Sequence, residues 1–125
     1  MTTRKFTNIV TIFMLATVAQ FAQATITEAQ EKAQITKLSK KMNASKAAFE
    51  KDKKNNKLKA SYIKDAMAVA DMTLEALYLS PKQKYPASLR LYRAVLKLDS
   101  KHKAANEKKN LIEGIYKSMG RPVPK

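Results

Sequence analysis

The chain of 125 residues has few of the side chains that catalysis or metal binding requires. His102 is the only histidine, there is no cysteine, and His102 stands between Lys101 and Lys103. A general base needs a second group to orient it, and the sequence offers His102 no identifiable partner. Without cysteine and with one histidine, no transition-metal site is predicted. We therefore expect His102 to be an exposed turn residue and the protein not to be an enzyme.

The carboxylates do not form a catalytic pattern either. Asp65, Asp71 and Glu75 are spaced along one segment with helical periodicity, and Asp71 and Glu75 form an i,i+4 pair of like charge. Such a pair is unfavourable when desolvated, so we expect both side chains to be solvated. No glycine-rich phosphate loop is present. The sequence predicts no catalytic, metal-binding or cofactor-binding residues and no cofactor.

Lysine is the strongest compositional bias, and the formal net charge of the chain is +15. Such a charge favours anionic partners, although a solvated lysine-rich surface is the alternative interpretation. Lysine lacks the bidentate fork of arginine, so specific recognition of nucleic acid is not expected. The densest cluster has no aromatic platform for base stacking apart from Phe49. This cluster predicts diffuse binding of an anionic polymer, a membrane surface or nucleic acid, and its candidate residues are Lys37, Lys40, Lys41, Lys53, Lys54, Lys57 and Lys59.

The N-terminus has the pattern of a targeting segment. Arg4 and Lys5 precede an apolar stretch over residues 6–19, and Ala22-Gln23-Ala24 fits a small-x-small cleavage site. The apolar stretch is short and interrupted by polar residues, which disfavours a membrane span. We predict a bacterial Sec-type signal peptide over residues 1–24, cleaved after Ala24, and a location in the periplasm or outside the cell. The alternative is an anchor helix that stays attached.

The remaining residues predict an all-α fold of four antiparallel helices in two stacked helical hairpins. Apolar periodicity places the helices at about 28–51, 57–79, 86–98 and 103–119, within one domain over residues 25–120. Thr27 and Gln30 fit a capping box, and Gly120 fits a left-handed helix end. The prolines at 81 and 86 predict a loop over residues 80–86. Residues 121–125 are expected to form a short extended tail. The residues expected at apolar positions are Ile35, Leu38, Met42, Phe49, Leu58, Tyr62, Ile63, Ala66, Met67, Val69, Ala70, Thr73, Leu74, Leu77, Tyr78, Leu89, Tyr92, Val95, Leu96, Ala104, Ala105, Leu111, Ile112, Ile115, Tyr116 and Met119.

Two helix ends repeat at a fixed distance. Residues 47–52 (AAFEKD) and 94–99 (AVLKLD) each begin with three apolar residues and end with Asp, and the two segments are 47 positions apart. Helical repeats commonly have periods of about 34–47 residues. The pattern is consistent with an internal duplication and equally with coincidence between two amphipathic helix ends.

Residues 58–120 resemble the tetratricopeptide-repeat family. Tyr92, Leu96 and the Leu98-Asp99 ending resemble the second helix of such a repeat, and Tyr116 with Gly120 resembles the end of the next first helix. Ser100 stands where the family usually has proline, and Glu113 where it usually has a small residue. The resemblance implies a protein-interaction or scaffolding module that binds a protein or peptide in a groove lined by the second and fourth helices. It further implies that self-association is possible and that a peptide carboxylate is engaged by Lys64, Lys108, Asn110 and Lys117.

Overall fold

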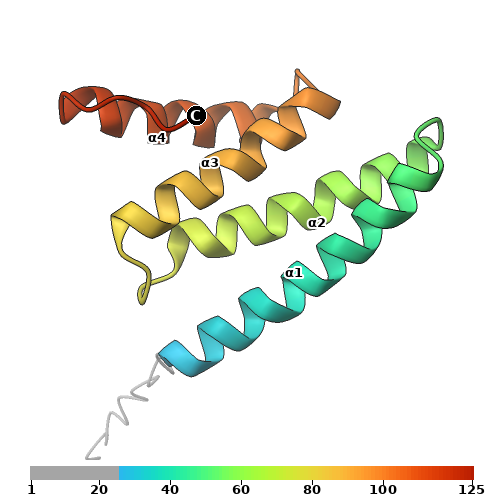
Figure 1. Ribbon diagram of the computed structural model, residues 1–125, viewed down its shortest axis with the longest axis horizontal. Helices are drawn as coiled ribbons and strands as arrows, with labels where there is room; N and C mark the ends of the chain where they lie inside the picture. The colour runs from blue at the N-terminus through green and yellow to red at the C-terminus, as the bar shows by residue number, and fades with distance from the viewer. Residues whose placement is uncertain (1–25) are drawn as a thin grey trace, which may run out of the picture.

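A computed structural model describes residues 26–125, and in this part of the chain it shows four α-helices and no strand. The helices are α1 (Glu28–Lys51), α2 (Asn56–Glu75), α3 (Pro81–Leu98) and α4 (Lys103–Ser118). Each helix packs antiparallel on the next, so that the chain zigzags from α1 to α4 (Figure 1). The all-α fold predicted from the sequence is confirmed. The predicted signal peptide lies outside the described residues.

Helix α1 begins and ends where the sequence predicts. The Thr27 hydroxyl accepts a hydrogen bond from the Gln30 backbone N–H at 3.2 Å, and the Gln30 side chain accepts one from the Thr27 N–H at 2.8 Å. This reciprocal capping box satisfies two of the unpaired N–H groups at the start of the helix. At the other end, Asp52 leaves the helical conformation and its N–H bonds to the Phe49 carbonyl.

Helix α2 ends four residues earlier than predicted. We expected it to continue to Leu79, but it stops at Glu75, and Leu77 is 82% exposed rather than part of the core. The N–H groups of Leu77 and Tyr78 donate instead to the carboxylate of Glu31, at 3.1 and 3.4 Å. A tertiary contact between residues 46 positions apart has replaced the last helical hydrogen bonds.

Helix α3 begins five residues earlier than predicted, so the expected loop over residues 80–86 is wrong. Pro81 occupies the first helical position, where its missing N–H costs nothing. The Gln83 side chain accepts from the Ser80 N–H at 3.1 Å and from the Ser80 hydroxyl at 3.0 Å. Pro86 lies inside the helix, one turn from its start, where it removes a single backbone hydrogen bond. The connection between α2 and α3 is therefore only residues 76–80.

Helix α4 ends in a Schellman motif. Gly120 adopts the predicted left-handed conformation with φ +64°, its N–H bonds to the Lys117 carbonyl, and the Arg121 N–H bonds to the Tyr116 carbonyl. The tail then turns back over α4 (Figure 1). Its Pro124 carbonyl accepts a hydrogen bond from Arg93 of α3 at 2.6 Å, and Val123 packs against the core.

The core lies along the seams between consecutive helices. Phe49 of α1 stacks on Tyr62 of α2 with ring centroids 6.1 Å apart, and Tyr85 of α3 meets Tyr116 of α4 edge to face at 6.5 Å. Tyr92 is fully buried, and its hydroxyl donates to Asp71 of α2 at 2.6 Å. The buried cluster consists of Phe49, Tyr62, Ala66, Ala70, Leu89, Tyr92, Val95, Ala105 and Ile112. Leu111 and Met119, which belong to the expected apolar positions, are 54% and 48% exposed.

The two hairpin turns share one geometry at the 47-residue offset. Asp52 (φ −140°, ψ 79°) and Asp99 (φ −144°, ψ 90°) end α1 and α3 in the same conformation. Three residues later, the side chains of Asn55 and His102 cap α2 and α4 by accepting from the N–H groups of Leu58 and Ala105. The 47-residue offset in the sequence therefore corresponds to a repeated turn and cap geometry.

Candidate functional site

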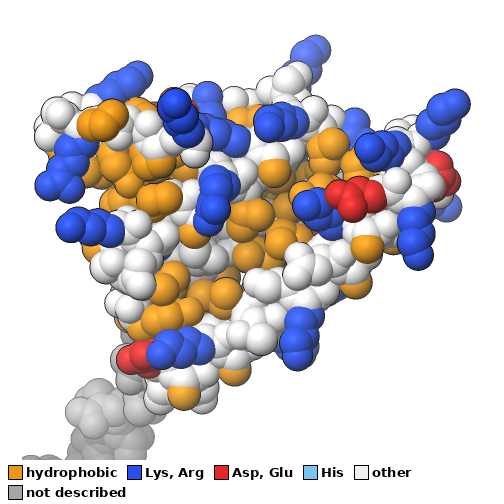
Figure 2. Space-filling model, viewed as in Figure 1, with side chains coloured by type: hydrophobic (Ala, Val, Ile, Leu, Met, Phe, Trp, Pro, Cys, Tyr) orange, Lys and Arg blue, Asp and Glu red, His pale blue; other side chains and the backbone are white. Residues whose placement is uncertain are grey.

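Hydrophobic side chains gather on one face of the molecule, over α2, α3 and α4, and Lys and Arg side chains surround them (Figure 2). A distinct pocket of about 290 Å³ lies where the C-terminal ends of α1 and α3 come together. Both helices are antiparallel to α2, so they run in the same direction and bring equivalent ends to one side. The pocket is thus a consequence of the repeated hairpin.

The pocket has apolar walls and a charged opening. Its apolar lining comes from Phe49, Tyr62, Ala94 and Leu98. Three exposed charged side chains complete the lining, Glu50 and Lys53 from the first hairpin and Lys97 from α3. Glu50 and Lys97 occupy corresponding positions of the 47-residue repeat, so the same structural position carries opposite charges in its two copies.

The electrostatic balance at this opening is positive. Residues 46–57 and 97–101 contain seven lysines against three acids. Glu50 pairs with Lys46 at 3.8 Å, whereas Lys53 and Lys97 have no ion pair within the part of the chain that the structure describes. The C-terminal ends of α1 and α3 lie at this opening, and their partial negative charge offsets part of the positive charge of the lysines. The two lysines without an ion pair still make an anionic group favourable at their ammonium groups.

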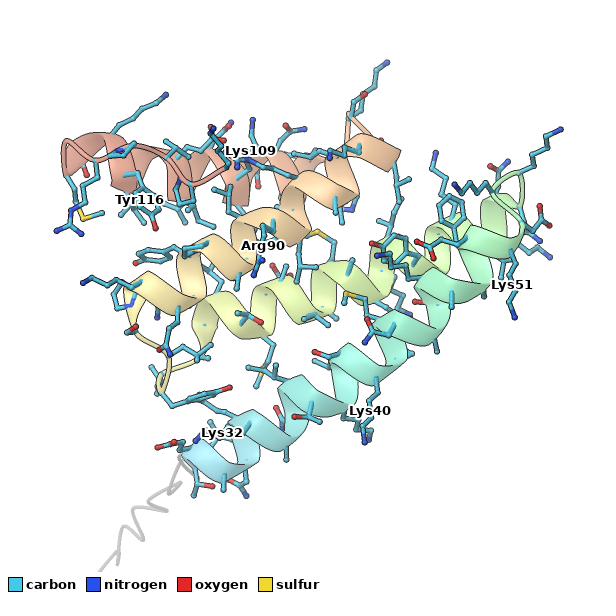
Figure 3. All side chains as sticks on the ribbon, in the orientation of Figure 1. Lys32, Lys40, Lys51, Arg90, Lys109 and Tyr116 are labelled. Carbon is cyan, nitrogen blue, oxygen red and sulfur yellow. The ribbon has the colours of Figure 1, made fainter. Side chains whose placement is uncertain are left out.

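The lysines predicted to form an anionic-surface site do not lie in one patch. Lys41 pairs with the buried Asp65 at 3.3 Å, and Lys59 is half-buried. Lys40 extends from α1 away from α2 (Figure 3), with Lys37 exposed one turn before it. Lys53, Lys54 and Lys57 are exposed at the turn that leads into α2. From residue 40 to the end of α1 the helix rises by about 16 Å, so the cluster divides into a helix group and a turn group.

The four residues implied by the family resemblance are not brought together. Only consecutive helices pack extensively in residues 26–125, so α3 separates α2, which carries Lys64, from α4. On α4, Lys108 lies about 160° around the helix from Asn110 and about 180° from Lys117. Lys64, Asn110 and Lys117 are exposed and Lys108 is half-buried. A single carboxylate cannot contact these four side chains together.

The remaining titratable residues have structural roles. His102 is half-buried rather than exposed, and its Nδ1 accepts the Ala105 N–H at 3.2 Å as the N-cap of α4. Asp71 is not simply solvated, because it accepts the Tyr92 hydroxyl. Burial and this hydrogen bond raise the pKa of Tyr92 above its ordinary value. Within residues 26–125, no three His, Cys, Asp or Glu side chains cluster as metal ligands would.

Sequence reasoning missed the pocket because three of its seven lining residues come from α3. Phe49 and Tyr62 were assigned to the core, and Lys97 and Ala94 were assigned no role. The 47-residue offset was the one available signal, because it predicts that the ends of α1 and α3 are equivalent. It gave no indication that those ends lie side by side.

Comparison of the chain with protein-family models, with curated proteins and with solved structures found no match. None of the four helices in the described residues has the length and apolar character needed to cross a membrane.

Proposed function

We propose that this chain is an exported, non-enzymatic protein-interaction module built from tetratricopeptide-like helical hairpins. The observation that carries the proposal is the preformed apolar pocket with a basic opening at the hairpin ends. Binding sites are typically concave and mostly apolar, with a few polar groups that orient the partner. The repeated turn geometry at Asp52 and Asp99 supports the hairpin-repeat assignment. Export is supported by the pattern of residues 1–24.

Capture from the envelope of the source organism tests the interaction. The tagged full chain should retain a defined protein after washing with 0.15 M NaCl, and Ala94→Leu, which narrows the pocket, should reduce the amount retained. Recovery of nucleic acid or polymer alone would contradict this function. Mass spectrometry of the exported protein should show Thr25 as its first residue, and an intact Met1 would contradict export through cleavage.

A second candidate function is diffuse binding of an anionic polymer or membrane surface through Lys37–Lys59. It is favoured by the exposure of Lys37, Lys40, Lys53, Lys54 and Lys57, none of which has an ion pair within residues 26–125. Binding of this kind weakens steeply with salt because it depends on the release of counterions. Retention on heparin that is lost between 0.15 and 0.5 M NaCl would support it, and retention above 0.5 M would exclude a purely electrostatic mode.

A further inference from the structure

The pocket at the ends of α1 and α3 has the size of one large side chain. Its volume of about 290 Å³ is at the lower limit of ligand pockets, which span about 300–1,000 Å³. Its apolar walls come from three helices, with Phe49 on α1, Tyr62 on α2 and Leu98 on α3. The pocket is open on one side and too small for a whole drug-sized ligand, whereas an apolar side chain that projects from a larger partner fits in it.

The walls of this pocket are fixed before anything binds. Phe49 and Tyr62 are 8% and 9% exposed, and their stacked rings belong to the buried core. Ala94 and Leu98 lie about one turn apart on α3, next to the fully buried Val95 and at the helix end. An incoming side chain therefore meets a formed surface and does not have to reorganise it, which preserves affinity.

The charge around the opening indicates what should flank that side chain. Lys53 and Lys97 line the same pocket without an ion pair in the described residues, while Glu50, the one acid in the lining, pairs with Lys46 at 3.8 Å. Carboxylates on either side of an inserted apolar group would meet these two ammonium groups. Lysine contacts of this kind are geometrically tolerant, so they suit a short flexible segment better than one rigid anion.

We propose that the pocket binds an acidic peptide segment that inserts one apolar side chain and places its neighbouring carboxylates on Lys53 and Lys97. This inference rests on the interaction-module function and specifies the chemistry of the partner. The apolar walls would anchor the inserted side chain, and the two lysines would select segments that have acidic residues on either side of it.

Fluorescence anisotropy with two labelled peptides tests this site on the full chain. The probes are Asp-Glu-Leu-Glu-Asp and Asp-Glu-Ser-Glu-Asp, which differ only in the central side chain. We expect the leucine probe to bind about tenfold more tightly than the serine probe. Ala94→Leu, which narrows the pocket, should reduce that preference, and circular dichroism confirms that the variant remains folded.

A matched pair of charge reversals separates this site from diffuse attraction. The double change Lys53→Glu with Lys97→Glu should weaken the leucine probe about tenfold. Lys37→Glu with Lys40→Glu alters the net charge equally but lies away from the pocket, and it should leave affinity within about twofold. Equal losses in both double variants, or equal affinity for the two probes, would overturn the proposal.

The other possible occupants give different results. If anionic phosphatidylglycerol vesicles bind through Lys53 and Lys97 while neither peptide binds, the pocket is a membrane contact and the proposal is wrong. If a captured envelope protein binds equally to the wild type and to the Lys53→Glu, Lys97→Glu variant, this pocket is not the site. The interaction-module function would then stand without it.

Discussion

Glu31 shows how one carboxylate determines the length of another helix. Its side chain is 5% exposed, and it accepts hydrogen bonds from the N–H groups of Leu77 and Tyr78. Glu31 and Phe49 are 18 residues apart, about five helical turns, so both lie on the face of α1 that packs on α2. A buried charge is tolerated when its hydrogen bonds are satisfied. The sequence indicated only that Glu31 is favourable near the N-terminus of α1.

Tyr92 is the residue for which a pH dependence is expected. Its burial, and then its hydrogen bond to Asp71, raise its pKa in the folded state above the ordinary value of about 10. Below pH 10 the phenol is neutral in both the folded and the unfolded chain, so its contribution to stability is fully present. Above pH 10 only the unfolded chain ionises, and the free energy of unfolding falls.

Tyr92→Phe removes that contribution. At pH 7 we expect the variant to be less stable by about 1–2 kcal/mol, because one buried hydrogen bond is lost. Urea unfolding at several pH values should show the difference from the wild type shrinking between pH 9.5 and 11.5. Ionising lysines affect both proteins alike and cancel in the difference. A constant difference over this range would contradict the raised pKa of Tyr92.

At the scale of the element, local capping determines most helix ends. Thr27 with Gln30 begins α1, Asn55 caps α2, Ser80 with Gln83 begins α3, and Gly120 ends α4. Each device works within about three residues, so it leaves a local pattern in the sequence. We predicted the ends at Thr27 and Gly120, but the prolines at 81 and 86 led us to expect a loop where the Ser80–Gln83 box begins α3. The end of α2 has no such local device, and the sequence misplaced it.

Replacing Gly114, inside α4, and Gly120, just after α4, with alanine should change the stability of the chain in opposite directions. Gly114 lies inside the helix with no atom within 4 Å of an added Cβ, so Gly114→Ala should stabilise the chain by about 1 kcal/mol. The same substitution at Gly120 is equally unobstructed, but its φ of +64° penalises a Cβ by about 1 kcal/mol or more. Thermal unfolding measures the change in stability of each of the two variants. Loss of stability in Gly114→Ala would show that this glycine has a packing role.

At the scale of the whole molecule, positive charge opposes compaction. Arg4 and Lys5 are the only charged residues before Glu28, so +13 of the +15 belongs to the helical part of the chain. The ion pairs found in residues 26–125 use only Glu28, Glu50, Asp65, Glu107 and Glu113 of the ten acids. Most lysines therefore repel one another across a small surface.

Stability should consequently increase with moderate salt. Two like charges 10 Å apart in water repel by about 0.4 kcal/mol, and many such pairs exist at low ionic strength. Raising NaCl from about 0.01 to 0.3 M shortens the screening length well below their spacing, so we expect a higher Tm. Sodium chloride is preferred to sulfate, which stabilises folded proteins by exclusion from their surface. A Tm that falls or stays constant would show that lysine repulsion is not significant.

The sequence by itself determined the helical class, the complete extent of α1, the turn after α3 and the left-handed end at Gly120. Those features depend on apolar periodicity and on hydrogen bonds between residues a few positions apart. Only the tertiary structure decided where α2 ends, which acids are buried, and that the ends of α1 and α3 form a pocket. The reason is that these features depend on residues about 20–50 positions apart that come together, as Glu31 and Leu77 do through a hydrogen bond and Phe49 and Lys97 do by lining one pocket. Local sequence patterns carry no record of which distant segments will meet.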